Sequence, residues 1–150
     1  MQGVIKTDKG DIVVRFFPEV APVTVASFIH NARTGLYNGT TFHRVVPTFV
    51  IQGGDPKSKD PNAQDVGTGG PGYYLPLEPS SKPHLTGTLS MARAQNRNSG
   101  GSQFYICLGD QPSLNGEYTV FGEVASGMEV VNQIVQGDVI RSITIVPKTS

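Results

Sequence analysis

The sequence has only one cysteine and no long hydrophobic run, and each absence excludes a class of protein. Because Cys107 is alone among the 150 residues, neither an internal disulfide nor a zinc site of several cysteines can form. No apolar run approaches the 18 residues of a membrane-spanning helix, and residues 1–8 lack the apolar core of a signal peptide. We therefore expect a cytoplasmic protein in which Cys107 is a small buried residue.

Charge of one sign is not in excess either. The 12 basic and 12 acidic residues cancel, so no overall field favours nucleic acid or an anionic membrane as a partner. The sequence contains neither a heptad repeat nor a sustained apolar stripe that would indicate a protein partner, so we expect a monomer. The three histidines, His30, His43 and His84, are dispersed without nearby carboxylates or thiols, so neither a metal nor a cofactor is expected.

Glycine and proline are abundant, with 18 and 11 residues. Their sum exceeds the average of about 12% for the pair but stays below the roughly 25–30% that indicates disorder. The length fits one domain over residues 1–150, rich in turns. Residues 53–72 show little periodicity and predict a long surface loop, which is a candidate functional element.

Alternating apolar residues predict seven or eight β-strands and two helices. The strands are expected at residues 4–7, 11–17, 41–46, 49–53, 86–92, 104–108, 119–124 and 139–146. The first helix runs from Pro22 to Gly35, and the second begins with a capping box of Ser126 and Glu129 and ends at Gly137. This pattern indicates an antiparallel all-β domain, most simply a barrel closed at its ends by the helices.

Two motifs with familiar chemistry are better explained by structure than by function. Residues 67–72 contain G-x-G-x-x-G, but no alternating strand precedes them and no helix pattern follows, so we expect no dinucleotide site. Cys107 lies in the apolar run 104–108. The sequence leaves open a meeting of Cys107 with His43, but a packed thiol is favoured over a nucleophile.

The most informative stretch is Phe42–Asp55, with the sequence FHRVVPTFVIQGGD. In a continuous strand Arg44 would share a face with Phe42 and Val46. An arginine in a strand is usually a surface residue, so this pattern alone is weak. The stretch resembles the active-site signature of the cyclophilin-type peptidyl-prolyl isomerases. Further matching segments follow in the family's order, so the resemblance covers essentially the whole chain: residues 87–92, 101–106 and 120–124.

The resemblance implies an eight-stranded antiparallel closed barrel capped by two α-helices, and an enzyme that accelerates rotation of X-Pro peptide bonds without a cofactor. It implies three catalytic residues: Arg44, Phe49 and Gln52. Of these, Arg44 donates a hydrogen bond to the prolyl nitrogen. Phe49 and Gln52 lie three apart, so they reach one side only if the chain bends between Pro47 and Gln52. It also implies a substrate-binding set: Val50, Ala92, Arg93, Ala94, Gln103, Tyr105, Ser113, Leu114 and Tyr118.

The chain departs from the best-known eukaryotic pattern at four of these positions. Val50 replaces methionine, Arg93 asparagine, Ser113 tryptophan and Tyr118 histidine. Ser113 removes a large aromatic wall, which predicts weakened binding of cyclosporin. The pattern is more similar to short prokaryotic members of the family.

The expected partners are proline-containing peptides and unfolded protein segments. One alternative is a proline-peptide binding module, or a holdase, that keeps the pocket but contributes little catalysis. Another is a barrel that binds a small ligand in its lumen. This is disfavoured because the apolar strand residues are numerous enough to fill a small barrel.

Overall fold

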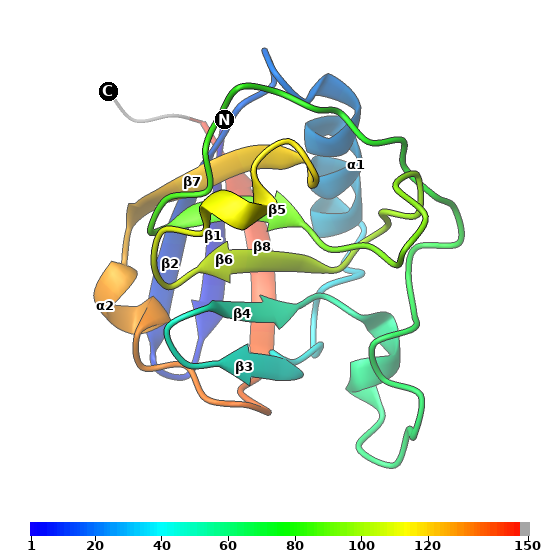
Figure 1. The fold of residues 1–150 in the computed structure, drawn as a ribbon. Coiled ribbons are helices and arrows are strands. Elements are labelled where there is room, and N and C mark those ends of the chain that lie inside the picture. Colours follow the sequence, from blue (N-terminus) through cyan, green and yellow to red (C-terminus); the bar gives the residue numbers. More distant parts are fainter. Residues whose placement is uncertain (148–150) are drawn as a thin grey trace.

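A computed structural model of the chain describes residues 1–147. It contains eight strands: β1 Gln2–Thr7, β2 Gly10–Phe16, β3 Arg44–Val46, β4 Val50–Gly53, β5 Thr88–Met91, β6 Phe104–Cys107, β7 Val120–Ser126 and β8 Ile140–Val146. All neighbouring pairs are antiparallel, and the order across the sheet is β3-β4-β6-β5-β7-β2-β1-β8. Figure 1 shows the sheet curled, with β3, β4, β6 and β5 in front of β2, β1 and β8.

The two edges of the curled sheet are joined by the segments that flank β3 and β8. Residues 39–42 and 137–140 exchange backbone hydrogen bonds, including Phe42 N to Asp138 O at 2.9 Å and Ile140 N to Thr40 O at 2.7 Å. This pairing satisfies backbone groups that an open edge would leave exposed. The predicted all-β fold of eight antiparallel strands with two helices is confirmed, and these flanking segments, rather than paired strands, close the sheet.

Helix α1, Pro22–Arg33, begins with the predicted proline and packs against the interior of the sheet. Phe28 is fully buried, and four aromatic rings surround it with centroids 5.0–5.6 Å away: Phe16, Tyr37, Phe104 and Phe121. These side chains fill the interior at the end of the sheet covered by α1. The packing disfavours the alternative of a ligand-binding lumen.

The second helix is shorter than predicted. α2 spans Met128–Val131, and its N-cap residue is Gly127 with φ 92° and no side-chain hydrogen bond. The predicted capping box of Ser126 and Glu129 is wrong, because β7 continues through Ser126 and Gly127 turns the chain directly into the helix. Figure 1 shows α1 and α2 on opposite sides of the sheet. Within residues 1–147, no helix has the length and apolar character needed to cross a membrane.

A long connection between β4 and β5 follows the surface, and its first part extends beyond the sheet at the lower right of Figure 1. It contains one short 3₁₀ helix, η1 (Pro56–Lys59), whose N-cap is Asp55. The predicted loop over residues 53–72 is therefore largely confirmed. Residues 73–76 are not helical, which agrees with the expectation that the glycine motif before them is not a dinucleotide site.

Candidate active site

The β3–β4 hairpin brings Arg44 and Gln52 together as direct cross-strand partners. Arg44 Nη1 donates a hydrogen bond to Gln52 Oε1 at 3.2 Å, and Gln52 Nε2 donates to Gln103 Oε1 at 3.1 Å. Because arginine has only donors, this contact turns the amide oxygen of Gln52 toward Arg44. The guanidinium also lies 5.8 Å from the centre of the Phe49 ring, within the range of a cation–π contact.

Phe49 lies in the turn of this hairpin. Residues 47–49 form the turn, Thr48 has φ 65°, and Phe49 N donates to Val46 O at 3.0 Å. A residue in a turn is free of the alternation that governs a strand, so Phe49 and Gln52 line the same cavity. The predicted bend between Pro47 and Gln52 is confirmed.

The predicted common face of Phe42, Arg44 and Val46 is wrong. β3 begins only at Arg44, so Phe42 precedes the strand and does not follow its alternation. The Phe42 side chain is fully buried, with its ring 6.2 Å from that of Phe104, whereas Arg44 is exposed at the cavity. Phe42 therefore belongs to the hydrophobic core, whereas Arg44 belongs to the cavity.

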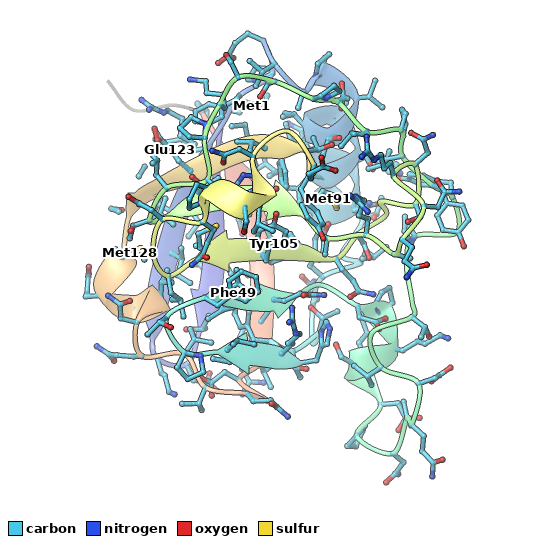
Figure 2. The ribbon with its side chains drawn as sticks, viewed as in Figure 1. Met1, Phe49, Met91, Tyr105, Glu123 and Met128 are labelled. Atoms are coloured by element: carbon cyan, nitrogen blue, oxygen red, sulfur yellow. The ribbon has the colours of Figure 1, made fainter. Side chains whose placement is uncertain are left out.

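A cavity of about 100 Å³ opens beside Arg44. Nine of the twelve predicted site residues line it: Arg44, Phe49, Val50, Gln52, Ala92, Arg93, Tyr105, Leu114 and Tyr118. Val50, Tyr105 and Cys107 form a buried apolar cluster, and Phe49 and Leu114 pack against it. Figure 2 shows Phe49 and Tyr105 near each other on the face formed by β4 and β6. One small cavity is therefore lined both by this apolar cluster and by the cationic donor Arg44.

Arg93 forms a wall of this cavity together with Tyr118. Its guanidinium lies 4.4 Å from the centre of the Tyr118 ring. Nε and Nη2 donate to Glu117 O at 3.1 and 2.7 Å, and Nη1 donates to Ala94 O at 2.9 Å. Because main-chain carbonyls occupy these donors, Arg93 contributes shape to the cavity more than free charge.

A second cavity of about 630 Å³ adjoins the first and shares Gln52, Ala92 and Arg93 with it. Ala94 and Gln103, the other predicted binding residues in this region, line the second cavity. The structure thus gathers eleven of the twelve predicted residues around two adjoining cavities. Ser113 is the exception: it lies exposed in the 3₁₀ helix η2, Pro112–Leu114, and lines neither cavity.

A polar network that sequence reasoning missed lies beneath Tyr105. His84 is 1% exposed, with Nδ1 3.1 Å from Asn115 Oδ1 and Nε2 2.9 Å from the Tyr105 hydroxyl. Burial lowers the pKa of His84 and raises the pKa of Tyr105, so a neutral imidazole faces a protonated phenol. The sequence places the two residues 21 positions apart, and no local pattern connects them.

The predicted packing of Cys107 is confirmed. The side chain is fully buried beside Val50 and Tyr105, and burial raises the pKa of the thiol to about 12. Because the thiolate is the nucleophilic form, this environment opposes nucleophilic catalysis by Cys107. Burial also lowers the pKa of His43, the histidine that the sequence left open as a partner.

The fold is similar to that of a known class of enzyme. A solved cyclophilin type peptidyl-prolyl cis-trans isomerase from Cryptosporidium parvum, determined in the presence of the dipeptide Ala-Pro, superposes with a TM-score of 0.86. The two sequences are 30% identical, and the match covers 99% of this chain and 100% of that one. The architecture is therefore the cyclophilin fold.

Sequence relatives give the same result. A peptidyl-prolyl cis-trans isomerase from Synechococcus elongatus is 48% identical over 147 residues, which cover 97% of this chain and 96% of the relative. Peptidyl-prolyl cis-trans isomerase B from Bacillus subtilis is 46% identical over 140 residues, with 92% of each chain covered. Residues 4–149 match the family described as cyclophilin type peptidyl-prolyl cis-trans isomerase/CLD. The chain belongs to this family and is a peptidyl-prolyl cis-trans isomerase, as the sequence indicated.

Proposed function

We propose that this isomerase acts on X-Pro bonds in peptides and unfolded protein segments by binding the twisted amide more tightly than either planar form. The observation that carries the proposal is that Arg44 lines the same small cavity as the apolar side chains of Phe49 and Leu114. The planar amide resists rotation by about 18–20 kcal/mol because its nitrogen lone pair is conjugated with the carbonyl. In the twisted amide that lone pair becomes a hydrogen-bond acceptor.

Arg44 is the proposed donor to this lone pair. Its guanidinium would act as a charged hydrogen-bond donor, through electrostatics and not as an acid. Gln52 accepts a hydrogen bond from Arg44 and holds the guanidinium beside the cavity. A rate gain on the order of 10⁵ requires about 7 kcal/mol of selective stabilisation. One such donor typically supplies about 3–4 kcal/mol, so orientation and exclusion of water must supply the rest.

The apolar part of this cavity is the proposed site for the proline ring. Its apolar lining comes from Phe49, Val50, Tyr105, Leu114 and Tyr118, which would exclude water from the rotating bond. The Cryptosporidium parvum relative was solved in the presence of Ala-Pro, which supports a proline-containing peptide as the ligand.

The substrate backbone is proposed to follow the segment after β5. Ala92 N is already bonded to Gln103 O at 2.9 Å, so this segment can bind a peptide through its remaining polar groups and side chains. Ala92, Arg93 and Ala94 would form an extended wall, with Gln103 as a polar contact from the facing strand end.

Three finer features are part of the same proposal. We infer weak binding of cyclosporin, because the small side chain of Ser113 is exposed and lines neither cavity. We infer a reducing location such as the cytoplasm, supported by the single, buried thiol of Cys107. We infer a monomer, because the exposed large apolar side chains of residues 1–147 are few and, apart from the neighbours Tyr73 and Tyr74, come from separate segments.

Magnetisation-exchange NMR on an Ala-Pro peptide tests the proposed function. The enzyme is expected to increase the exchange rate between the cis and trans signals at substoichiometric concentration. A binding module or holdase would broaden the signals without increasing the exchange rate, and that result would refute the proposed catalysis.

A further inference from the structure

A chain of hydrogen bonds connects Arg44 to a buried carboxylate outside the cavity. Arg44 donates to Gln52 at 3.2 Å, Gln52 donates to Gln103 at 3.1 Å, and Gln103 Nε2 donates to Gly69 O at 2.9 Å. Gly69 N in turn donates to Asp55 Oδ2 at 3.2 Å. This series of hydrogen bonds thus begins at the Arg44 guanidinium and ends at the Asp55 carboxylate.

Asp55 is fully buried, and its carboxylate organises the loop that follows β4. Oδ1 accepts a hydrogen bond from Lys57 N at 2.8 Å, and Oδ2 accepts from both Gly67 N and Gly69 N. A buried carboxylate requires such donors, and charge-assisted hydrogen bonds of this kind are the stronger ones. Asp55 therefore fixes the position of the Gly69 peptide, whose carbonyl receives Gln103.

Gly69 approaches Asp55 so closely that a side chain has no room. A Cβ atom on Gly69 would lie 2.0 Å from Asp55 Oδ1 and 3.1 Å from Asp55 Cγ. The neighbouring residue Gly70 has nothing within 4 Å of the corresponding position. Neither glycine has a positive φ, so the difference between them is steric and not conformational.

The two side-chain amides in this series of hydrogen bonds, those of Gln52 and Gln103, have the same orientation. Arginine has only donors, so Gln52 presents its oxygen to Arg44 and its amino group to Gln103. Gln103 likewise presents its oxygen to Gln52 and its amino group to Gly69 O. Hydrogen bonds aligned in this way strengthen one another. A displaced Gly69 carbonyl would leave the Gln103 amide, and then the Gln52 amide, free to rotate.

We propose that Asp55 is a positioning residue of the active site, which acts through Gly69, Gln103 and Gln52 to hold the Arg44 guanidinium toward the cavity. This inference rests on the proposed role of Arg44. Asp55 lines neither cavity, and the Gly69 peptide that it holds lines only the second one, so its effect falls on the orientation of the donor and not on the cavity proposed for the proline ring. Loss of the connection lowers kcat and leaves KM nearly unchanged.

Two matched pairs of variants test the proposal in the full-length enzyme. Gly69→Ala is expected to displace the Asp55 carboxylate, whereas Gly70→Ala adds the same methyl group where no atom lies within 4 Å. Both glycines line the second cavity, so the pair controls for the effect of a methyl group in that cavity. Asp55→Asn replaces one of the acceptor oxygens by a donor, whereas Asp65→Asn removes a carboxylate that pairs with Lys57 in the same loop. Asp65 has no contact with the Gly69 peptide among the hydrogen bonds of residues 1–147.

The measurements are kcat and KM on an Ala-Pro peptide, and the NMR signals of the Arg44 Nε–H and the Gln52 side-chain amide in the free enzyme. Gly69→Ala and Asp55→Asn are expected to lower kcat about fivefold to tenfold, less than the roughly 10²–10³ for removing a donor outright. KM stays within about twofold and the side-chain signals shift. In a Gln103→Ala background neither variant lowers kcat further, because the connection is already broken.

Turnover in Gly69→Ala equal to that in Gly70→Ala would overturn the proposal. A loss equally large in Asp65→Asn, or losses that add to that of Gln103→Ala, would also overturn it. If Asp55→Asn does not fold, the two glycine variants decide the question alone. Arg44→Ala is the reference. Normal turnover in Arg44→Ala refutes the role of Arg44 itself. If Arg44→Ala loses turnover while Gly69→Ala turns over normally, only the connection to Asp55 is refuted.

Discussion

The hydroxyl of Tyr105 lies 2.9 Å from Nε2 of the buried His84, and their rings are nearly parallel, with 14° between the planes. Ser90 Oγ is 3.2 Å from the same nitrogen but donates its proton to Thr119 O at 2.8 Å. The Tyr105 hydroxyl is therefore the donor that a neutral His84 accepts. Because Tyr105 lines the active-site cavity, a buried neutral imidazole supports the floor of that cavity.

This relationship predicts how stability depends on pH. Burial lowers the pKa of His84, so the unfolded chain binds a proton near the ordinary pKa of about 6.5 while the native protein does not. The free energy of unfolding is expected to be constant above pH 7. It should decrease as the pH falls through about 6.5, by at most about 1.4 kcal/mol per pH unit for one group. Burial lowers the pKa of His43 as well, which adds a loss of the same sign.

Urea denaturation between pH 7.5 and 5.5 measures this dependence. The control is His84→Gln, which keeps polar groups at the site but does not titrate, and its slope should be smaller than that of the parent protein. A parent stability that does not change over this range would contradict the prediction.

Substitution of Arg44 should separate charge from geometry. Arg44→Ala is expected to lower kcat/KM by about 10²–10³, because it removes a donor from the twisted amide. Arg44→Lys keeps the positive charge but lacks the planar fork that bonds Gln52, so its loss should be intermediate. Arg44 is exposed, and the thermal midpoint of both variants should stay near that of the parent. Normal turnover in Arg44→Ala would show that catalysis uses another group.

Cys107 should react only when the protein unfolds. The thiol is fully buried, and burial raises its pKa to about 12, so access and thiolate are both lacking in the native state. A thiol reagent is expected to label the chain slowly at pH 8 and rapidly in 8 M urea, on the order of 10²-fold faster or more. Cys107→Ala should retain most of the activity. Rapid labelling of the native enzyme would contradict the packed position.

Gly127 and Gly39 both have a left-handed backbone conformation, but substitution by alanine should affect them differently. Gly127 has φ 92°, and a Cβ there would lie 2.4 Å from Asp11 O. Gly39 has φ 83° with nothing within 4 Å. Gly127→Ala should therefore cost about 2–4 kcal/mol, from backbone strain plus a clash with main chain, and Gly39→Ala about 1 kcal/mol from strain alone. Urea denaturation measures both losses, and equal losses would show that strain, not contact, dominates at Gly127.

Local sequence patterns were sufficient for the elements whose signals come from their own residues. Pro22 marked the start of α1, and the alternation of apolar residues marked β1 and β2, which the structure pairs with each other. The second helix was predicted less well. Its capping box was a valid local pattern, but pairing of β7 with β2 extends the strand to Ser126, and the helix begins after Gly127. Sheet pairing is a long-range interaction, so it overrode the local preference.

The sequence by itself determined the class of fold and, through the resemblance of several segments to one family, pointed to eleven residues that line the two cavities. These signals are local, because strand alternation and a contiguous motif are written in neighbouring residues. Only the tertiary structure decided that Ser113 stays outside, that His84 supports Tyr105, and that Asp55 is connected to Arg44. Those contacts join residues from different segments, and their partners are chosen by how the sheet curls and closes, which no short stretch of sequence specifies.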